Sequence, residues 1–283
     1  MPTERMKVNG LRVAYNRSGR GFPALLLHGF PRTRRVWDAL TPLLADRLSV
    51  VAVDRRGYGE SERPADPATC NPRQHAADAL ELMGSVGIDR FLVVGHDLGA
   101  PVARHLAAAH PDRVAGAVIM DATPDGAGLG RRPDPTGRSW YLDFFRQRGV
   151  AEAIVGRDPA LFFGLFLDRH AHLSAEERQR YLDAYCQKGS VEAVLADYRA
   201  LLEEEPAYWD AEAAAGRRMD TPLCVFWAER GPVGALPVLE AWRRVASDVR
   251  GASIADTAHY IQEERPDETA RRILAFAEEL GLT

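Results

Sequence analysis

The chain has 283 residues, of which 46% are hydrophobic and 27% are charged, and its net charge is −4. These values suit one large globular domain, with or without an insertion, that buries a sizeable core. Because positive and negative residues are interspersed, the composition argues against nucleic-acid binding and against a polybasic membrane anchor. The sequence has no apolar export segment, no apolar run of about 18 residues and only three widely spaced cysteines, which favours a cytoplasmic location.

Short apolar runs alternate with helical patterns in the first and last parts of the chain. Strands are expected at Met6–Val8, Leu11–Tyr15, Ala24–His28, Ser49–Asp54, Phe91–Gly95, Ala115–Met120, Leu223–Trp227 and Ala252–Ala255. Helices are expected near Val36–Ala45, Asn71–Val86, Pro101–His110, Pro237–Ala246 and Glu268–Leu280. Asn9-Gly10 predicts a hairpin turn between the first two strands. The later strands are continuous apolar runs, so we expect a doubly wound α/β fold with a mostly parallel sheet.

This alternation is interrupted between about Asp125 and Met219, where the sequence has no convincing strand. Helices are expected at Trp140–Gln147, Ala151–Val155, Pro159–Asp168, Ala175–Cys186 and Val191–Glu204. We interpret the segment as a helical cap over the active face of the sheet. The predicted organisation is therefore a core from residues 1–124, a cap from residues 125–219 and a second part of the core from residues 220–283.

A Gly-x-Asp-x-Gly motif, Gly95-His-Asp-Leu-Gly99, lies between the strand that begins at Phe91 and the following helix. Strand, glycine-flanked residue and helix together form the layout of a nucleophile elbow, a sharp turn that lifts one side chain above the sheet. Asp97 occupies the position at which many hydrolases carry serine. A carboxylate there can displace a leaving group from an sp3 carbon and form an aspartyl ester. The simpler interpretation is a tight turn with a helix-capping Asp.

Other polar residues follow neighbouring strands of the same predicted sheet, where ligand sites of such folds lie. His259 follows the last strand, and we expect it to be the base that activates water to hydrolyse the ester. Asp121 follows the strand after the nucleophile helix and is the favoured partner of that histidine, with Glu229 as the alternative. The backbone N–H groups of Phe30 and Leu98 are expected to bind an oxyanion.

These motifs resemble the Asp-nucleophile branch of the α/β-hydrolase superfamily, which contains epoxide hydrolases and dehalogenases. The residues that carry the resemblance are His28-Gly-Phe-Pro31, Asp54-Arg-Arg-Gly-Tyr-Gly-Glu-Ser61, Gly95-His-Asp-Leu-Gly-Ala100 and Asp197-Tyr-Arg-Ala200. The likeness is strongest to the fluoroacetate (haloacetate) dehalogenase group and covers nearly the whole chain. It implies the α/β-hydrolase fold, a cap inserted after the strand that ends at Asp121, and the roles of Asp97 as nucleophile, His259 as base and Asp121 as acid.

The sequence differs from related hydrolases at the acid that partners the histidine and at the positions that would bind a substrate carboxylate. Many relatives place the acid after the next-to-last strand, where this chain has Gly231. Haloacetate dehalogenases also carry arginines directly after the nucleophile and three residues later, to hold the substrate carboxylate. Here those positions are Leu98 and Pro101, and an apolar pair cannot offset the desolvation of a carboxylate.

The cap residues leave the substrate class open. The tyrosine of the dehalogenase halide pocket matches Tyr198, whereas the pocket's His and Trp correspond to Tyr141 and Leu142. A loop-length difference would instead bring Trp140 into the pocket. Epoxide hydrolases resemble this chain in using cap tyrosines as donors to the epoxide oxygen, so we expect Tyr198 and Tyr141 to bind the leaving group. Further pocket residues are expected to be Trp140, Leu142, Phe144, Phe145 and Pro101.

We favour an epoxide hydrolase that acts on a neutral small molecule through an ester on Asp97. The alternatives are a haloacetate or haloalkane dehalogenase and a non-catalytic hydrolase-fold receptor. We expect no metal or organic cofactor and no nucleic-acid or membrane partner, and a homodimer is compatible with each hypothesis. Arg32, Arg34 and Arg35 are expected to be solvated, and Leu201–Glu205 is expected to be a solvated helix end.

Overall fold

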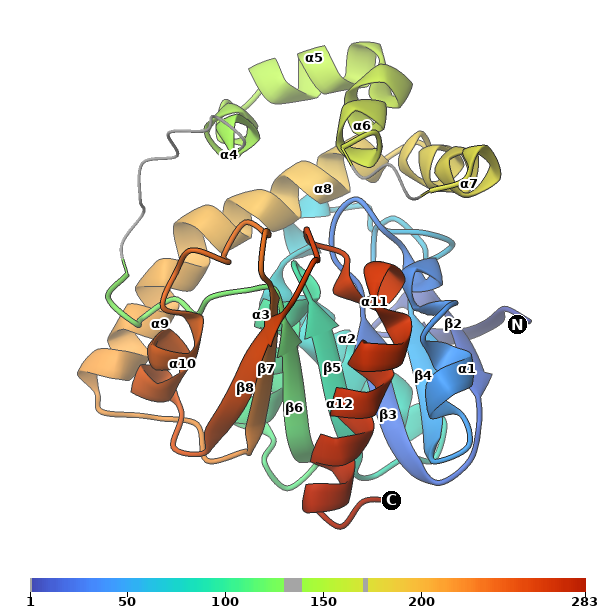
Figure 1. Cartoon of the computed structure of the whole chain (residues 1–283). Coiled ribbons are helices and arrows are strands. Elements are labelled where there is room, and N and C mark those ends of the chain that lie inside the picture. Colours follow the sequence, from blue (N-terminus) through green and yellow to red (C-terminus); the bar gives the residue numbers. More distant parts are fainter. Residues whose placement is uncertain (1, 130–138, 170–172) are drawn as a thin grey trace.

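A computed structural model describes residues 2–129, 139–169 and 173–283. Its centre is an eight-stranded sheet with the order β1-β2-β4-β3-β5-β6-β7-β8 (Figure 1). The strands are β1 (Glu4–Val8), β2 (Leu11–Ser18), β3 (Phe22–Leu27), β4 (Leu48–Val53), β5 (Phe91–His96), β6 (Val114–Met120), β7 (Leu223–Ala228) and β8 (Val249–Ile254). β2 pairs antiparallel with β1 and β4, and all other pairings are parallel. The predicted α/β class with a mostly parallel sheet is confirmed.

The Asn9-Gly10 turn joins β1 to β2, as predicted. Its two residues have φ angles of 44° and 84°, the left-handed conformations that a two-residue hairpin turn needs to match the strand twist.

Helices cover both faces of the sheet and supply its two apolar cores. One face carries α2 (Pro72–Ser85), α3 (Gly99–Ala109) and α10 (Val238–Val245). The other face carries α1 (Thr41–Leu44), α11 (Ile261–Glu264) and α12 (Pro266–Glu279). The strands between these layers are apolar on both sides, which explains the continuous apolar runs.

The helix expected at Val36–Ala45 forms as two short pieces. The first is the 3-10 helix η1 (Arg34–Trp37), and the second is the α-helix α1. Pro42 has no N–H for a helix continuing from η1, but it fits the first turn of a new helix. A third short element, the 3-10 helix η2 (Pro67–Thr69), precedes α2.

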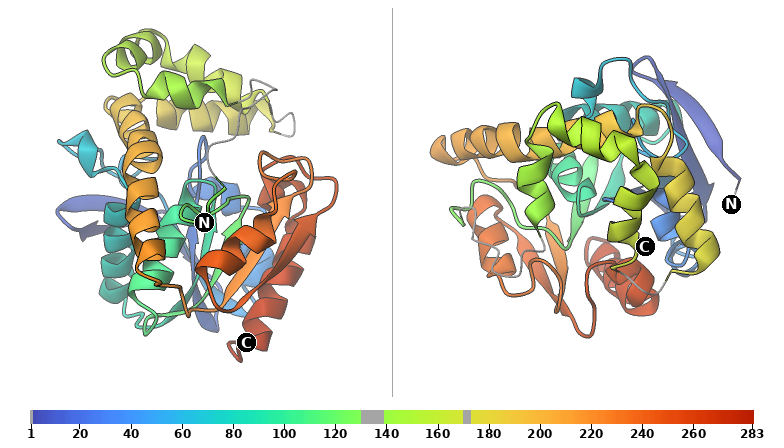
Figure 2. Two further views of the ribbon diagram at one scale, coloured as in Figure 1. Left: turned by 90° about the vertical axis from the view of Figure 1, so that its left-hand side faces the viewer. Right: turned by 90° about the horizontal axis from the view of Figure 1, so that it is seen from above.

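Between β6 and β7 the described chain is helical. The elements are α4 (Trp140–Phe145), α5 (Val150–Arg157), α6 (Pro159–Leu167), α7 (Ala175–Tyr185), α8 (Ser190–Arg199), the π segment η3 (Ala200–Glu204) and α9 (Glu205–Ala214). Helices α4–α8, here named the helical layer, lie above the edge of the sheet at which the parallel strands end (Figures 1 and 2). Residues 130–138 of the predicted cap lie outside the described residues.

The expectation that Leu201–Glu205 is a solvated helix end is wrong for Glu205. This residue begins α9, is 1% exposed and accepts hydrogen bonds from His105 and Trp209. Its partners lie on α3 and one turn further along α9, so its burial depends on a tertiary contact. Within the described ranges, no helix combines the length and apolarity needed to cross a bilayer.

Candidate active site

The turn between β5 and α3 brings Asp97 to the upper edge of the sheet. Asp97 has a φ of 52°, a left-handed conformation that is uncommon for a residue with a side chain. The turn is possible because its neighbours are glycines: a Cβ at Gly29 would lie 2.3 Å from the Asp97 Cβ, and one at Gly99 would lie 2.1 Å from the Leu27 oxygen. Leu98, not Asp97, is the N-cap of α3, so the simpler helix-cap interpretation of Asp97 is wrong.

The Asp97 carboxylate faces both a backbone donor and a histidine. Its Oδ1 accepts a hydrogen bond of 2.8 Å from the Phe30 N–H, and its Oδ2 lies 3.6 Å from Nε2 of His259. The side chain is 23% exposed and is therefore partly accessible to a small molecule. The Leu98 N–H makes no corresponding hydrogen bond to Asp97 among the described residues.

His259 is held on its other side by Asp121. Its Nδ1 lies 2.5 Å from Oδ2 of Asp121, whose side chain is fully buried. The second oxygen of Asp121 accepts a hydrogen bond of 2.9 Å from the Ala228 N–H. The structure therefore brings together the three predicted residues in the order Asp97, His259, Asp121.

Gly231 leaves room for the Asp121 carboxylate. A Cβ at this position would lie 2.9 Å from Oδ2 of Asp121 and 2.7 Å from the Ala258 oxygen, which is closer than real side chains allow. The alternative acid, Glu229, is directed away and accepts a hydrogen bond from the exposed Asp256 N–H. The geometry therefore favours Asp121 as the partner of His259.

The charges of the two carboxylates control the protonation of His259. Burial alone would lower the pKa of His259, but the hydrogen bonds and negative charges of Asp121 and Asp97 raise it to about 10. Burial would raise the pKa of Asp97, but the hydrogen bond and charge of His259 lower it to about 2. At neutral pH the resting site is thus an imidazolium between two carboxylates.

Two further residues, not predicted as functional, fix the position of His259. Glu264 accepts hydrogen bonds from the backbone N–H groups of Ala258, His259 and Tyr260 at 2.7, 3.0 and 2.8 Å. His96 lies 3.0 Å from the His259 oxygen through Nε2, and the two rings are 4.7 Å apart. Burial, followed by the charge of His259, lowers the pKa of His96 to about 4, so His96 is neutral. The glutamate follows the histidine by five positions, but only the folded loop makes it a backbone acceptor.

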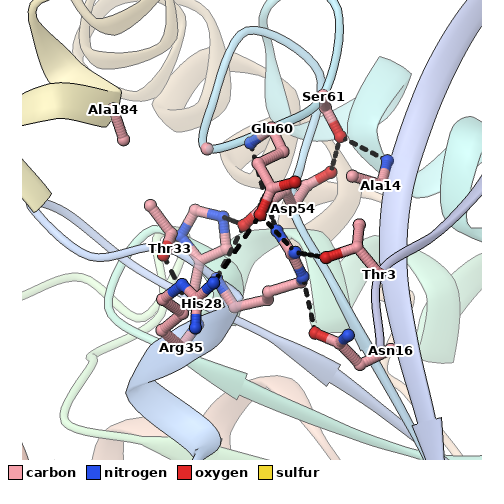
Figure 3. A network of polar contacts seen from close by, with 12 residues as sticks. Thr3, Ala14, Asn16, His28, Thr33, Arg35, Asp54, Glu60, Ser61 and Ala184 are labelled. Carbon is pink, nitrogen blue, oxygen red and sulfur yellow. Dashed lines mark hydrogen bonds and ion pairs between the residues drawn. The ribbon is translucent and has the colours of Figure 1, made fainter. Parts of the chain in front are cut away.

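The loop that carries Phe30 is anchored by a buried polar network (Figure 3). Arg34 donates to Asn16 and Glu60, both at 2.6 Å, and forms an ion pair with Asp54. Asp54 also accepts the Arg34 and Glu60 N–H groups at 2.7 and 2.8 Å. The network joins the loops after β3 and β4 and so holds the Phe30 N–H in place.

The expectation that the three arginines are solvated is therefore wrong for Arg34 and Arg32. Arg34 is 2% exposed, and Arg32 is fully buried. The Arg32 guanidinium pairs with Glu263 at 3.0 Å and lies 3.8 Å above the Tyr260 ring. Only Arg35 has a partly exposed side chain, at 41%. Carboxylates from distant segments compensate the buried charges, which the local sequence does not show.

Two tyrosines of the helical layer pack together, and one of them lies against the loop that carries Phe30. Tyr198 on α8 is 3% exposed, and its ring lies 5.4 Å from that of Phe30 and 5.7 Å from that of Tyr141 on α4. The pKa of Tyr198 is raised well above its ordinary value, first by burial and then by the nearby Tyr141 and Asp97. By contrast, Trp140 is 44% exposed. Tyr141, rather than Trp140, therefore packs against Tyr198.

The other predicted pocket residues are apolar, and most of them pack in one cluster. Phe145 is fully buried and lies 5.0 Å from the Tyr198 ring. Leu142 and Phe144 are half-buried against the same apolar cluster, which also contains Phe30 and Leu98. Pro101 is half-buried in the first turn of α3. Among the described residues, no group of three His, Cys, Asp or Glu side chains is arranged to hold a metal ion.

The chain is similar to known proteins in both sequence and structure. Residues 23–266 match the family described as alpha/beta hydrolase fold. The chain is 30% identical to a fluoroacetate dehalogenase from Burkholderia sp, over 91% of this chain and 88% of the relative. It is 30% identical to epoxide hydrolase A from Mycobacterium tuberculosis, over 99% of each chain. A solved structure from Pseudomonas aeruginosa, provisionally named an epoxide hydrolase, has a TM-score of 0.90 and 32% identity over 99% of this chain and 96% of that one.

Proposed function

The chain belongs to the α/β-hydrolase family, and on that basis we propose that it is an epoxide hydrolase acting through an ester on Asp97. That it is a hydrolase of this fold follows from its relatives, which are named as dehalogenases and epoxide hydrolases. The choice between these chemistries rests on the side chains that face the nucleophile. In this proposal the helical layer is a cap that closes over a neutral small-molecule substrate.

The pair of phenols, Tyr198 and Tyr141, carries the choice of an epoxide. When a nucleophile opens an epoxide, negative charge develops on the ring oxygen, and a phenol can donate a hydrogen bond or a proton to that oxygen. Two phenol rings 5.7 Å apart, above the Phe30 loop, suit one such oxygen. A buried phenol with a raised pKa stays protonated at neutral pH and therefore remains a donor.

In the first step, Asp97 attacks a ring carbon of the epoxide. A carbon–oxygen bond forms between Oδ2 and that carbon while the carbon–oxygen bond of the ring breaks. The ring oxygen takes a proton from one of the two phenols, and the product is a hydroxyalkyl ester of Asp97. Because the pKa of Asp97 is about 2, the nucleophile is ionised throughout the ordinary pH range.

Ester formation then converts His259 into a base. The ester removes the negative charge of Asp97, which had helped to raise the pKa of His259. The histidine therefore releases a proton, and this proton replaces the one that the phenol gave to the ring oxygen. Neutral His259, oriented by Asp121 at 2.5 Å, takes a proton from water as the water oxygen attacks the ester carbonyl carbon.

The backbone donor at Phe30 serves this second step. The Phe30 N–H already lies 2.8 Å from Oδ1 of Asp97, the oxygen that becomes negative in the tetrahedral intermediate. The Leu98 N–H is the expected second donor, reached when that oxygen moves out of the carboxylate plane. The intermediate collapses with cleavage of the bond between Cγ and Oδ2, and the leaving oxygen takes a proton from the His259 imidazolium. The new carboxylic acid then returns a proton to His259, which leaves the diol, the Asp97 carboxylate and the resting imidazolium.

Dehalogenation is the second candidate, supported by the 30% identity to a fluoroacetate dehalogenase. The same Asp97, His259 and Asp121 would serve it, with a halide leaving in place of the ring oxygen. The apolar Leu98 and Pro101 disfavour a haloacid substrate, because its buried carboxylate would have no cation there. A receptor function is disfavoured by the complete hydrolytic arrangement, which ligand binding alone does not require.

The test is intact-mass measurement of His259→Gln after incubation with styrene oxide, chloroacetate or 1-chlorobutane. Without the base, the ester should accumulate. A gain equal to the whole mass of the epoxide, mapped to Asp97, is the expected result. A gain equal to an organohalide minus hydrogen halide would replace the proposal with dehalogenation. No adduct from any probe, with Asp97→Asn binding the same compounds as wild type, would favour the receptor.

A further inference from the structure

The nucleophile and the phenol lie on different parts of the molecule. Asp97 belongs to the sheet core, whereas Tyr198 lies on α8 of the helical layer. The distance from the phenol to the reacting oxygen therefore depends on the contacts that hold α8 to the core. The residue next to the phenol makes several of these contacts.

Asp197 is a buried carboxylate that hydrogen-bonds to two core side chains and lies close to a third. Its Oδ2 lies 2.6 Å from Nη1 of Arg55 and 2.8 Å from the Tyr58 hydroxyl, which donates to it. Nε2 of His75 lies 3.4 Å from the same oxygen. The Asp197 and Arg55 side chains are each 1% exposed, and that of His75 is fully buried. Solvent therefore screens this contact very little.

Arg55 is itself fixed within the core. Its guanidinium lies 4.3 Å above the Tyr58 ring, and its backbone N–H donates to Nε2 of His28 at 3.3 Å. In the described part of the chain, Asp197 is the one carboxylate paired with Arg55, and the Arg55 Nε and Nη2 have no acceptor. The buried Arg55 cation thus has a single compensating anion. If α8 moved away, Arg55 and Asp197 would each lose the opposite charge that stabilises them.

Tyr198 follows Asp197 directly and packs on the loop that serves the nucleophile. Its ring lies 5.4 Å from that of Phe30, whose N–H binds Asp97. We propose that the buried Arg55–Asp197 ion pair is a positioning device that holds the Tyr198 phenol over Asp97, an inference that rests on the proposed function. Neither member of the pair is a catalytic residue; both act through Tyr198.

The neighbouring residue offers a matched control. Arg56 forms a second buried pair, with Asp78 of α2, through contacts of 2.5 and 2.7 Å. Its side chains are 4% and 5% exposed. This pair has the same chemistry and nearly the same burial, but it joins two parts of the core and does not reach α8.

The experiment is a double-mutant cycle on the rate of ester formation. Single-turnover formation of the ester from styrene oxide is followed by intact mass in the His259→Gln background. The cycle combines Asp197→Asn with Tyr198→Phe, and Asp78→Asn with Tyr198→Phe is the control cycle. Tyr58→Phe, which removes one neutral donor to Asp197, is the milder variant should Asp197→Asn not fold.

If the pair positions Tyr198, Asp197→Asn slows ester formation by about 100-fold, the effect expected of a misplacement near 1 Å. In the Tyr198→Phe background the same change then costs less than about threefold, because the group being positioned is already absent. Tyr58→Phe gives a smaller loss that also vanishes in this background. Asp78→Asn changes stability but not the rate, with or without Tyr198.

Three outcomes would overturn the inference. Losses from Asp197→Asn or Tyr58→Phe that multiply with that of Tyr198→Phe would mean that the pair acts independently of the phenol. Equal slowing by Asp78→Asn would mean that any buried pair has the same structural effect. Absence of an ester in the His259→Gln parent would instead refute the proposed function itself, and the positioning role with it.

Discussion

At the residue scale, the position of the Asp121 carboxylate depends on the absence of a side chain at residue 231. Asp121 occupies space that any Cβ at residue 231 would enter, because that atom would lie 2.9 Å from its Oδ2. The Asp121 carboxylate can therefore orient His259 only while residue 231 is a glycine.

We expect Gly231→Ala to lower turnover by about 10-fold or more, since the Asp121 carboxylate, 2.9 Å from the added Cβ, must move away from its position against His259. The measurement is kcat for styrene oxide. The control is Gly156→Ala, whose added Cβ meets no atom within 4 Å; it should leave kcat unchanged and raise stability by about 0.5–1 kcal/mol. Wild-type activity in Gly231→Ala would show that Asp121 does not need this space.

The ionised resting site also predicts a pH-dependent contribution to stability. The pKa of His259 rises on folding from about 6.5 to about 10. Its contribution is therefore present in full below about pH 6.5 and is lost as the pH rises toward about 10. The pKa of Asp97 falls to about 2, so its contribution is present above about pH 4 and is lost as the pH falls toward 2.

We therefore expect the difference in unfolding free energy between wild type and His259→Gln to be largest from about pH 4 to 6.5 and to shrink toward pH 10. Urea unfolding at several pH values measures it. A difference that stays constant across the alkaline range would contradict an imidazolium between Asp97 and Asp121.

At the element scale, the helix that carries Tyr198 continues toward the core through an irregular segment. The sequence predicts one helix at Val191–Glu204, whereas the structure has α8, the π segment η3 and α9. Pro206 explains the break, because it cannot donate a hydrogen bond to the Leu202 carbonyl. The Arg146 side chain donates to that carbonyl at 2.8 Å instead, which also ties the end of α4 to this segment.

Helix α9 is attached to the core through one buried carboxylate. Glu205 accepts from His105 of α3 at 2.7 Å and from Nε1 of Trp209 at 2.8 Å. We expect Glu205→Leu to lower the free energy of unfolding by about 2 kcal/mol or more, because both donors lose their acceptor. The neighbouring Glu204→Leu, at an exposed side chain, should change it by less than about 0.5 kcal/mol.

Urea unfolding of the two variants provides the comparison. Equal and small effects would show that the Glu205 contacts contribute little, and that α9 is held mainly by apolar packing.

At the scale of the whole molecule, the helical layer has an apolar inner side and exposed apolar residues on its outer side. Val150 and Ile154 on α5 are 52% and 54% exposed, and Leu161 and Leu165 on α6 are 64% and 50% exposed. In each helix the two residues are one turn apart and share a face. Apolar groups gathered on a surface favour association, and this face is where we expect copies of the chain to meet.

We expect the double variant Ile154→Glu, Leu161→Glu to reduce self-association while keeping kcat within about twofold of wild type, since surface changes away from the site act weakly. Light scattering over a concentration series and the epoxide assay are the measurements. An unchanged average mass would remove this face as the contact. A large loss of turnover would mean that the outer side of the layer affects the site.

Local patterns in the sequence predicted much of this fold and part of the site. Each predicted strand forms within a few residues of its expected bounds, because apolar runs and turn residues act over short distances. The glycines around Asp97 predicted the sharp turn, and the strand ends predicted that His259 and Asp121 would meet. These features depend on residues near each other in the chain or on the regular geometry of a parallel sheet.

Other features were decided only when distant segments met. Arg34 is buried because Asp54 and Glu60 converge on it, and Arg55 finds its carboxylate 142 positions away. The choice of Tyr141 over Trp140 depends on how α4 rests on α8. The sequence by itself determined the fold and the candidate site residues Asp97, His259 and Asp121, whereas the tertiary structure decided the pairings, because a buried charge or phenol is stabilised only by the partners that packing brings to it.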